Sequence, residues 1–362
     1  MKILSKYVLK IFFSYLGISL LLFSFILIME QVFQLVEIVV VKGAPVTEIF
    51  ILLFYSFPTI LVFSAPMAAT AASVITFGTL ASDREITAIR TSGTTISTVV
   101  KPVITAALLI TALMLPFNFF VTPASQFAFR RHSTKLAHKQ PAIQMEEGTQ
   151  VEVGDYTLLA HKINHREQTM QEVLINKPAD EDEPEMFITA RSGAWNIMDN
   201  TLSFVLYDGI IRHQPKDRPE ILSSAAFNEY TIVIIHGEED FEVTKNLQSM
   251  SPAEMKEEIK RLKEKNLPVY NVKTHFHLRG ALAGAIAALV LCGIPLGLKA
   301  EAKGKTVGAG ISLAIIGAYY FLLVSGIKLA FSGDIIPWLG IWLPNFIIAC
   351  FGIIMLKISF NK

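Results

Sequence analysis

Hydrophobic residues in this chain gather into long uninterrupted runs instead of alternating with polar residues. Six stretches contain no Asp, Glu, Lys, Arg or His, three near each end of the chain: 11–29, 49–82, 102–129, 280–298, 306–327 and 335–356. A helix needs about 20 apolar residues to cross a bilayer, and every stretch is long enough for one crossing. The pattern therefore predicts six transmembrane helices, grouped three and three.

The block between the third and fourth stretches has the composition of a water-soluble domain. It holds most of the charged residues and all 8 histidines. The predicted fold is a membrane α-helical bundle of six spans (3+3) with an inserted domain. We expect residues 1–129 to form spans one to three with a short helix at about 82–93. Residues 130–275 form the inserted domain, which ends in a helix at about 251–266, and residues 276–362 form spans four to six.

The inserted domain is predicted to be all-β before its last helix. Short segments rich in Val, Ile, Phe and Tyr, several of them alternating apolar with polar residues, are Tyr156–Ile163, Gln171–Asn176, Met186–Arg191, Leu202–His213 and Ile221–Ile235. Asp199-Asn200 suits a hairpin turn, and Asp208-Gly209 suits a bend or bulge. Short strands without intervening helices favour a sandwich, a barrel piece or a jellyroll-like domain.

Two short charged helices begin with the same sequence signature. Ser82 stands three residues before Glu85, and Ser251 stands three residues before Glu254. This is the spacing of a capping box, in which the serine and the glutamate each bond the other's backbone amide. We therefore expect both helices to start with a reciprocal cap, and Pro268 to follow the end of the second one.

The basic residues near the span ends predict the orientation in the membrane. If the N-terminus is cytoplasmic, the short inner segments hold eleven of them: Lys2, Lys6, Lys10, Arg84, Arg90, Lys101, Lys299, Lys303, Lys305, Lys357 and Lys362. The short outer segments hold only Lys42 and Lys328. Positive residues accumulate on the cytoplasmic side, so we expect both termini in the cytoplasm and the inserted domain in the periplasm.

Composition and motifs argue against catalysis by this chain. Its mean hydropathy of +0.47 with 17% charged residues is typical of a membrane protein, and the net charge of +1 gives no reason to expect a nucleic-acid partner. Gly304-Lys305-Thr306 imitates a phosphate loop, but the first glycine of that motif would fall on Lys299. The pairs His161 with His165 and His275 with His277 lack a completing ligand set, so we expect solvated histidines, with no metal and no cofactor.

The six charge-free runs also bear on two classes of membrane protein, secondary transporters and mechanotransmission proteins. A secondary transporter usually carries charged residues at mid-membrane for ion coupling, and the six runs have none. A mechanotransmission protein associated with an ABC-type ATPase typically has four spans and a larger outer domain. The six runs and the apolar lumen they would line favour a permease for a lipid.

Three regions of the sequence resemble the lipopolysaccharide-export permease family (LptF/LptG). They are FPTILVFSAPMAATAASVITFGTLASDREITAIRTSG at 57–93, ITARSGAWNIMDNTLSFVLYDG at 188–209, and MSPAEMKEEIKRLKEKN at 250–266 followed by HLRGALAGAIAALVLCGIPLGLKAEAKGKTVG at 277–308, with IWLPNFIIACFG at 341–352. Together with the 3+3 layout, the resemblance covers essentially the whole chain.

The resemblance implies an inner-membrane subunit that pairs with a paralogous permease and rests on a cytoplasmic ABC ATPase dimer. Such a subunit extracts lipopolysaccharide from the periplasmic leaflet, receives its acyl chains in a β-jellyroll domain and passes them to a periplasmic β-jellyroll bridge protein. The alternatives that stay open are a mechanotransmission role, a different lipid, and either of the two paralogues.

The resemblance also implies roles for particular residues. In the family a glutamate of the cytoplasmic helix sits in the ATPase groove, and Glu85 occupies the matching place. The candidate ATPase-coupling residues are those on and around this helix: Arg84, Glu85, Ile86, Ile89 and Arg90. A simpler reading, in which Glu85 only caps its own helix and the arginines only fix orientation, stays open.

Lipid phosphates in this family meet basic residues near the outer membrane surface. Arg130 and Arg131 follow the third span and Lys328 ends the fifth, so these residues are the candidates, with interfacial anchoring as the alternative. Several basic residues are expected after the first span, but the chain has Glu30, Glu37 and the single Lys42 there. Lys42 is retained as a fourth candidate.

Overall fold

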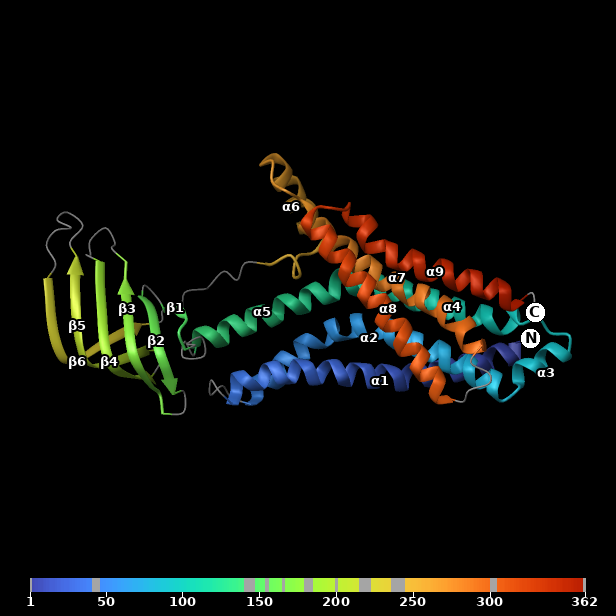
Figure 1. Ribbon diagram of the computed structural model, residues 1–362, viewed down its shortest axis with the longest axis horizontal. Coiled ribbons are helices and arrows are strands. Elements are labelled where there is room, and N and C mark those ends of the chain that lie inside the picture. The colour runs from blue at the N-terminus through green and yellow to red at the C-terminus, as the bar shows by residue number, and fades with distance from the viewer. Residues whose placement is uncertain are drawn as a thin grey trace. The chain divides into compact units, whose positions relative to one another are not determined.

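The computed structural model describes residues 2–40, 46–139, 147–153, 156–164, 167–178, 185–198, 201–214, 223–235, 245–299 and 305–360 (Figure 1). Its helices are α1 (Lys2–Val40), α2 (Val46–Ser82), α3 (Glu85–Thr91), α4 (Ser97–Pro116), the π-helix η1 (Phe117–Val121), α5 (Thr122–Lys139), α6 (Pro252–Glu264), α7 (Tyr270–Lys299), α8 (Lys305–Ser332) and α9 (Pro337–Phe360). Its strands are β1 (Gln150–Val153), β2 (Tyr156–Asn164), β3 (Thr169–Lys177), β4 (Glu185–Met198), β5 (Thr201–Gln214) and β6 (Ser223–Ile235).

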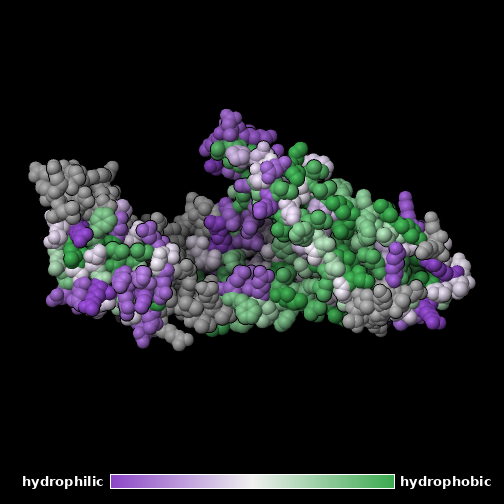
Figure 2. All heavy atoms as spheres, in the orientation of Figure 1, coloured by the Kyte–Doolittle hydropathy of each residue, from purple (hydrophilic) through white to green (hydrophobic). Residues whose placement is uncertain are grey.

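All six predicted spans are confirmed as helices of membrane length and composition. They run Ile3–Leu35, Val46–Ser82, Ser97–Leu136, Tyr270–Lys299, Gly308–Ser332 and Pro337–Ser359. Figure 2 shows apolar side chains covering much of the visible face of the helices, with hydrophilic residues at the end that carries α3 and on α6. The inserted all-β domain is confirmed as well, because a six-stranded sheet lies between the two groups of spans in the sequence.

The chain divides into two compact units. The helical unit comprises residues 1–30, 55–128 and 245–362, and the β-containing unit comprises 31–54 and 129–244. Helix α6 therefore clusters with the helical unit. The domain boundaries expected from the sequence, at 129/130 and 275/276, stay predictions.

Helix α7 is the central element of the helical unit. In an 18-residue apolar window of α7, 72% of the sequence is buried, against 17–39% in the corresponding windows of the other five spans. Helix α7 contacts α4, α8 and α9. Glycines let neighbours approach closely: a Cβ on Gly297 would lie 2.6 Å from the Val74 carbonyl oxygen of α2, and one on Gly352 would lie 2.6 Å from Leu291. Close backbone contact through small residues is the usual way in which membrane helices pack.

The third span is one continuous helical path with a local irregularity. Helix α4 ends at Pro116, the π-helix η1 follows, and α5 continues from Thr122. Proline removes a backbone hydrogen bond from the preceding turn, and π-bulges often accompany functional sites. Asn118 lies in this π-helix and is only 2% exposed.

The β-containing unit holds one antiparallel sheet in the sequential order β1-β2-β3-β4-β5-β6, so the described strands form a meander. One face is apolar and buried; its largest buried side chains are Phe204, Leu158, Met170, Ile188 and Leu206. The predicted segment Met186–Arg191 proves to be part of a longer strand, β4, because its pairing with β5 continues from Glu185 to Met198.

The two turn predictions in the sheet have different outcomes. Met198 pairs with Thr201, as a two-residue hairpin connection requires, but Asp199 and Asn200 themselves lie outside the described residues. The irregularity at Asp208-Gly209 is confirmed, because Asp208 has φ of +52°. A Cβ on Gly209 would lie 2.3 Å from Cζ of Phe227 in β6. Because glycine has no Cβ, the phenyl ring of Phe227 can lie against β5 at this position.

Helix α6 confirms its predicted caps. The Ser251 hydroxyl accepts from the Glu254 amide at 3.3 Å, and the Glu254 carboxylate accepts from the Ser251 amide at 2.7 Å. Pro252 occupies the first helical position. At the far end Asn266 has φ of +53°, and the Leu267 amide donates to Leu262, as in a Schellman cap.

Candidate functional site

The predicted coupling helix is present as α3, but its N-terminal cap differs from the prediction. Helix α2 runs through Ser82, whose hydroxyl donates to the Thr79 carbonyl one turn back. Arg84, with φ of +58°, precedes the first helical residue, and no side chain caps the helix. The predicted Ser82–Glu85 capping box is therefore wrong. A serine that is still helical cannot take the extended conformation that an N-cap needs.

Glu85 instead bonds across the fold. The Tyr7 hydroxyl of α1 donates to the Glu85 carboxylate at 2.9 Å, and Arg90 donates to the Ser359 carbonyl near the end of α9 at 2.9 Å. Helix α3 is thus attached at both ends to spans far away in the sequence. The helix ends at Thr91, and Gly93 just beyond it has φ of +75°.

The apolar residues of α3 face the bundle. Ile86 is buried in the core cluster around Phe12 and Leu80, and Ile89 packs against that cluster. Arg84, Thr87 and Ala88 are exposed. The isoleucines therefore hold the helix in place, while the polar side remains available to a partner.

A cavity of about 320 Å³ adjoins this helix. Its lining comes from the end of α2, from α3 and from the last turns of α7 and α9: Ala81, Ile86, Thr87, Arg90, Leu298, Lys299, Ile358 and Ser359. Its described lining residues include two cations, Arg90 and Lys299, and no carboxylate. An acidic group of a partner would be attracted here.

The predicted phosphate-contact residues fall in different parts of the structure. Arg130 is half-buried and Arg131 exposed on α5, in the β-containing unit. Lys328 is exposed on α8, in the helical unit. Lys42 lies outside the described residues. Next to the arginines His132 contacts the Glu48 carboxylate of α2, so the arginines stand on a helix fixed to the second span.

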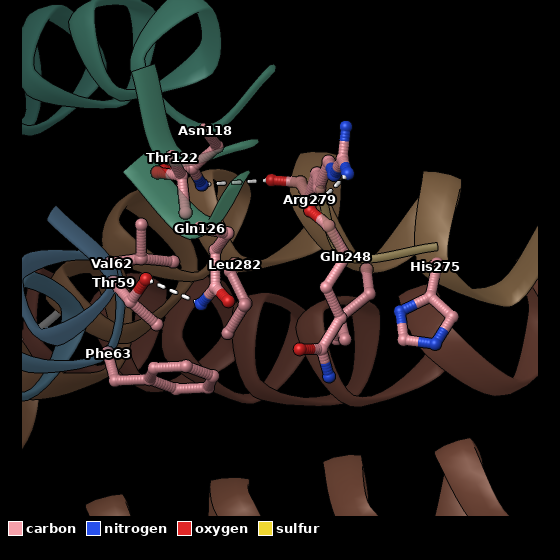
Figure 3. A pocket seen from close by; sticks show the side chains of 11 residues that line it. Thr59, Val62, Phe63, Asn118, Thr122, Gln126, Gln248, His275, Arg279 and Leu282 are labelled. Carbon is pink, nitrogen blue, oxygen red and sulfur yellow. Dashed lines mark hydrogen bonds between the residues drawn. The ribbon is translucent and has the colours of Figure 1, made fainter. Parts of the chain in front are cut away.

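A second cavity, of about 220 Å³, lies where the π-helix meets the first half of α7 (Figure 3). Helices α2, α5 and α7, the π-helix and the segment before α6 supply its lining: Thr59, Val62, Phe63, Asn118, Thr122, Gln126, Gln248, His275, Leu278, Arg279 and Leu282. Gln126 donates to the Thr59 hydroxyl at 2.8 Å across the cavity. The side chain of Asn118 donates to the Arg279 carbonyl at 3.0 Å.

Arg279 is bound by backbone carbonyls. Its guanidinium donates to Met250 at 2.8 Å, Gln248 at 2.9 Å and Leu247 at 3.2 Å. No ion pair joins it to a carboxylate within the described part of the chain. The segment leading to α6 is thereby fixed on the start of α7.

A comparison with known families decides the class of this protein. A sequence model described as "Lipopolysaccharide export system permease LptF/LptG" matches residues 6–358. This chain belongs to the LptF/LptG family. No match is found among curated proteins. As an LptF/LptG permease with six membrane-length helices, it is a multi-pass inner-membrane protein of lipopolysaccharide export.

Two histidines of this LptF/LptG chain, His275 and His277, are less exposed to solvent than predicted. His275 and His277 are half-buried on α7, and the ring of His275 lies 5.5 Å from that of Phe331. The apolar neighbours of the helix withdraw them from water. His161 is exposed on β2, while His165 lies outside the described residues. The described residues contain no group of three potential metal ligands.

Sequence reasoning gave no role to Tyr7, Asn118, His275 or Arg279. Arg279 stands one residue before the fourth charge-free run, and Asn118 interrupts an apolar run just after Pro116. Both positions carry a polar group at membrane depth, which is costly without a partner. This energetic cost could have indicated from the sequence that both residues have hydrogen-bond partners, but it could not identify those partners.

Proposed function

We propose that the chain is one permease subunit of an ABC-type lipopolysaccharide exporter. It pairs with a paralogous subunit, is driven by a separate cytoplasmic ATPase dimer, and extracts lipopolysaccharide from the periplasmic leaflet of the inner membrane. The observation that carries the proposal is the family match over residues 6–358, on a chain with six spans and an inserted β domain. ATP hydrolysis is the task of the partner.

The orientation in this proposal comes from the basic residues. Eleven of them adjoin the span ends on one side and two on the other. By the positive-inside tendency both termini and α3 are cytoplasmic, and the β sheet is periplasmic. Cysteines introduced at 200 and 303 of a chain without Cys292 and Cys350 test this. An impermeant thiol reagent should label position 200 from the periplasmic side, and labelling of 303 in intact spheroplasts would invert the topology.

The coupling site in this proposal is α3 with the cavity beside it. Glu85 is held by Tyr7 at the start of the helix, and Arg90 is held by the end of α9. A partner that pushes on α3 therefore moves α1 and α9 directly. The two cations of the adjoining cavity, Arg90 and Lys299, would receive an acidic group of the ATPase.

The β sheet in this proposal receives the acyl chains and passes them on. Its apolar face supplies the lipid-compatible surface. Strand β6 is a 13-residue edge with β5 as its only neighbour among the described strands. An unpaired edge can extend into another sheet by strand addition, so β6 is the edge that we assign to the periplasmic bridge protein.

Co-purification from native membranes tests the whole proposal. We expect the tagged chain to bring down a second permease, an ABC ATPase and lipopolysaccharide, each identified by mass spectrometry. Recovery of the ATPase with a different lipid would leave the permease role and change its substrate. Recovery of the ATPase with no lipid at all favours mechanotransmission and contradicts the proposal.

The phosphate contacts have their own test. Arginine can bind a phosphate through two hydrogen bonds, whereas an interfacial anchor needs only a long basic side chain. Changing Arg130 and Arg131 together to Ala should lower photo-crosslinking to lipopolysaccharide and lipid-stimulated ATPase activity at equal protein level. Changing both to Lys should keep part of each. If the Ala variant crosslinks like the parent, these arginines are anchors only.

A further inference from the structure

The chain enters the helical unit for the second time through a short entry segment, residues 245–251, which has neither helix nor strand. Strand β6 precedes this segment in the sequence, and α6 follows it. Asn246 Oδ1 accepts from the Ser249 amide at 3.1 Å and from the Ser249 hydroxyl at 2.8 Å. Ser249 is only 3% exposed. Linkers between compact units usually make few contacts, so the entry segment is unusually well fixed.

Arg279 of α7 holds the entry segment on the helices. Its guanidinium donates to three carbonyls of the segment, those of Leu247, Gln248 and Met250. Figure 3 shows the guanidinium turned away from the other side chains that line the cavity. Arginine presents five N–H donors in a rigid fork, so one side chain can bind several acceptors at once. A cation at the start of a membrane span is costly unless it is bound, and the three carbonyls supply that binding.

The third span is tied to the same place at two points. Asn118 of the π-helix donates to the backbone carbonyl of Arg279 at 3.0 Å. The Lys245 ammonium lies 5.1 Å from the centre of the Phe127 ring in α5, and it donates to Glu254 of α6 at 2.6 Å. The π-helix, α5, α6 and α7 therefore all contact the entry segment or the residue that binds it. A displacement of the third or the fourth span would move the entry segment with it.

The entry segment is also the point at which the helices meet the end of the β domain along the chain. Two units joined by a free linker move independently of each other, whereas a bound linker passes movement on. We propose that Arg279 is a positioning residue for lipid transfer, which anchors the C-terminal end of the β domain to the fourth span. The role rests on the proposed function, because it requires that the helices deliver lipopolysaccharide to the β domain. Arg279 acts in it only through the backbone of the entry segment.

Photo-crosslinking on the intact complex tests this role. A photoreactive phenylalanine replaces Tyr230, which packs against the apolar face of the sheet. The chain, its partner permease and the ATPase are reconstituted together in vesicles that contain lipopolysaccharide. Arg279→Met removes every donor and keeps an unbranched side chain. We expect this variant to keep ATPase recovery and lipid-stimulated ATPase activity, and to lower ATP-dependent crosslinking at position 230 at least about tenfold, the effect of one lost charge-assisted hydrogen bond.

Lys273 provides a matched control on the same helix. It is also a half-buried cation of α7, and no hydrogen bond joins it to the entry segment within the described part of the chain. Lys273→Met should therefore crosslink lipopolysaccharide at position 230 like the parent. Arg279→Lys should give an intermediate level, because the ammonium keeps the charge but places its three donors at a single point.

A covalent tether distinguishes positioning from a general structural role. In a chain without Cys292 and Cys350, cysteines replace Gln248 of the entry segment and His275 of α7, which line the same cavity. Joining the two cysteines with a short bifunctional thiol reagent should restore crosslinking at position 230 in Arg279→Met. A fold damaged by the substitution would not be repaired by this link.

Four results would contradict the role of Arg279. The first is parental crosslinking in Arg279→Met, and the second is an equal loss in Lys273→Met. The third is a loss of ATPase recovery or of lipid-stimulated ATPase activity in Arg279→Met, which would make the residue a part of the fold only. The fourth is a tether that restores nothing. A parent without any ATP-dependent crosslink at position 230 contradicts the proposed function itself, so the two failures are distinguishable.

Discussion

Helices α3 and α6 are both short and charged, and each has a glutamate in its first turn, three residues after a serine, yet they are held in different ways. Helix α6 is capped by its own residues, Ser251 and Glu254. Helix α3 has no side-chain cap, and its glutamate accepts a hydrogen bond from Tyr7, 78 residues away. A locally capped helix keeps its start when its surroundings move. A helix fastened to two distant spans would, in the proposed coupling role, pass its movement on to them.

The largest expected difference between the two helices concerns coupling. Glu85→Ala should insert normally but reduce co-purification of the ATPase by at least about tenfold, the loss expected for a buried charged hydrogen bond at an interface. Glu254→Ala removes a glutamate from the first turn of α6 and should leave ATPase recovery unchanged. Equal recovery with both variants would reduce Glu85 to a structural role. Glu85→Asp keeps the negative charge but shortens the side chain, so it distinguishes the effect of the charge from that of the carboxylate's position.

The Tyr7 bond provides a smaller and more selective test. Tyr7→Phe removes one hydroxyl and keeps the ring, and because the bond is solvent-exposed, we expect it to cost less than about 1 kcal/mol of stability. ATPase recovery should fall a few-fold, less than in Glu85→Ala, since the carboxylate remains but is less well oriented. A loss as large as that of Glu85→Ala would mean that Tyr7 itself contacts the partner.

The two serines should differ in their effect on local stability. Ser251→Ala removes a true cap and should cost α6 about 1 kcal/mol, which raises the exchange rate of its first amides about fivefold. Ser82→Ala removes only a bond to the preceding turn of α2 and should change exchange in α3 very little. Hydrogen exchange measured by mass spectrometry on both segments compares them directly. Equal acceleration in the two segments would contradict the observed caps.

The smallest expected effect is the response of α6 to pH. The hydrogen bond from Lys245, followed by that from the Ser251 amide, lowers the pKa of Glu254 below its ordinary 4.5. A carboxylate with a lowered pKa stabilises the folded helix above its ordinary pKa, and this contribution is lost as the pH falls through the lowered value. Protection of α6 should therefore persist to below pH 4.5. In Lys245→Met the protection of α6 should be lost at higher pH. If the midpoint of this loss is unchanged, the Lys245 contact does not lower the pKa of Glu254.

Short-range signals in the sequence were enough for much of the fold. The charge-free runs determined the six spans, since only a helix satisfies its own backbone in a bilayer. Alternating apolar segments located β2 to β6 but not the short β1, and the caps of α6 followed from residues within one turn of each other. The start of α3 could not be predicted in this way, because it depends on where α2 ends. The predicted turn residues Asp199 and Asn200 lie outside the described residues.

The sequence by itself thus determined where the chain crosses the membrane and where it forms a sheet, because these depend on the hydrophobicity and conformational preference of neighbouring residues. Only the tertiary structure decided the partners of the polar groups. Asn118 meets the Arg279 carbonyl across 161 residues, and Arg90 meets the Ser359 carbonyl across 269. A buried polar atom takes whichever donor or acceptor the packing of the helices brings to it, and that packing depends on close contacts such as those of Gly297 and Gly352.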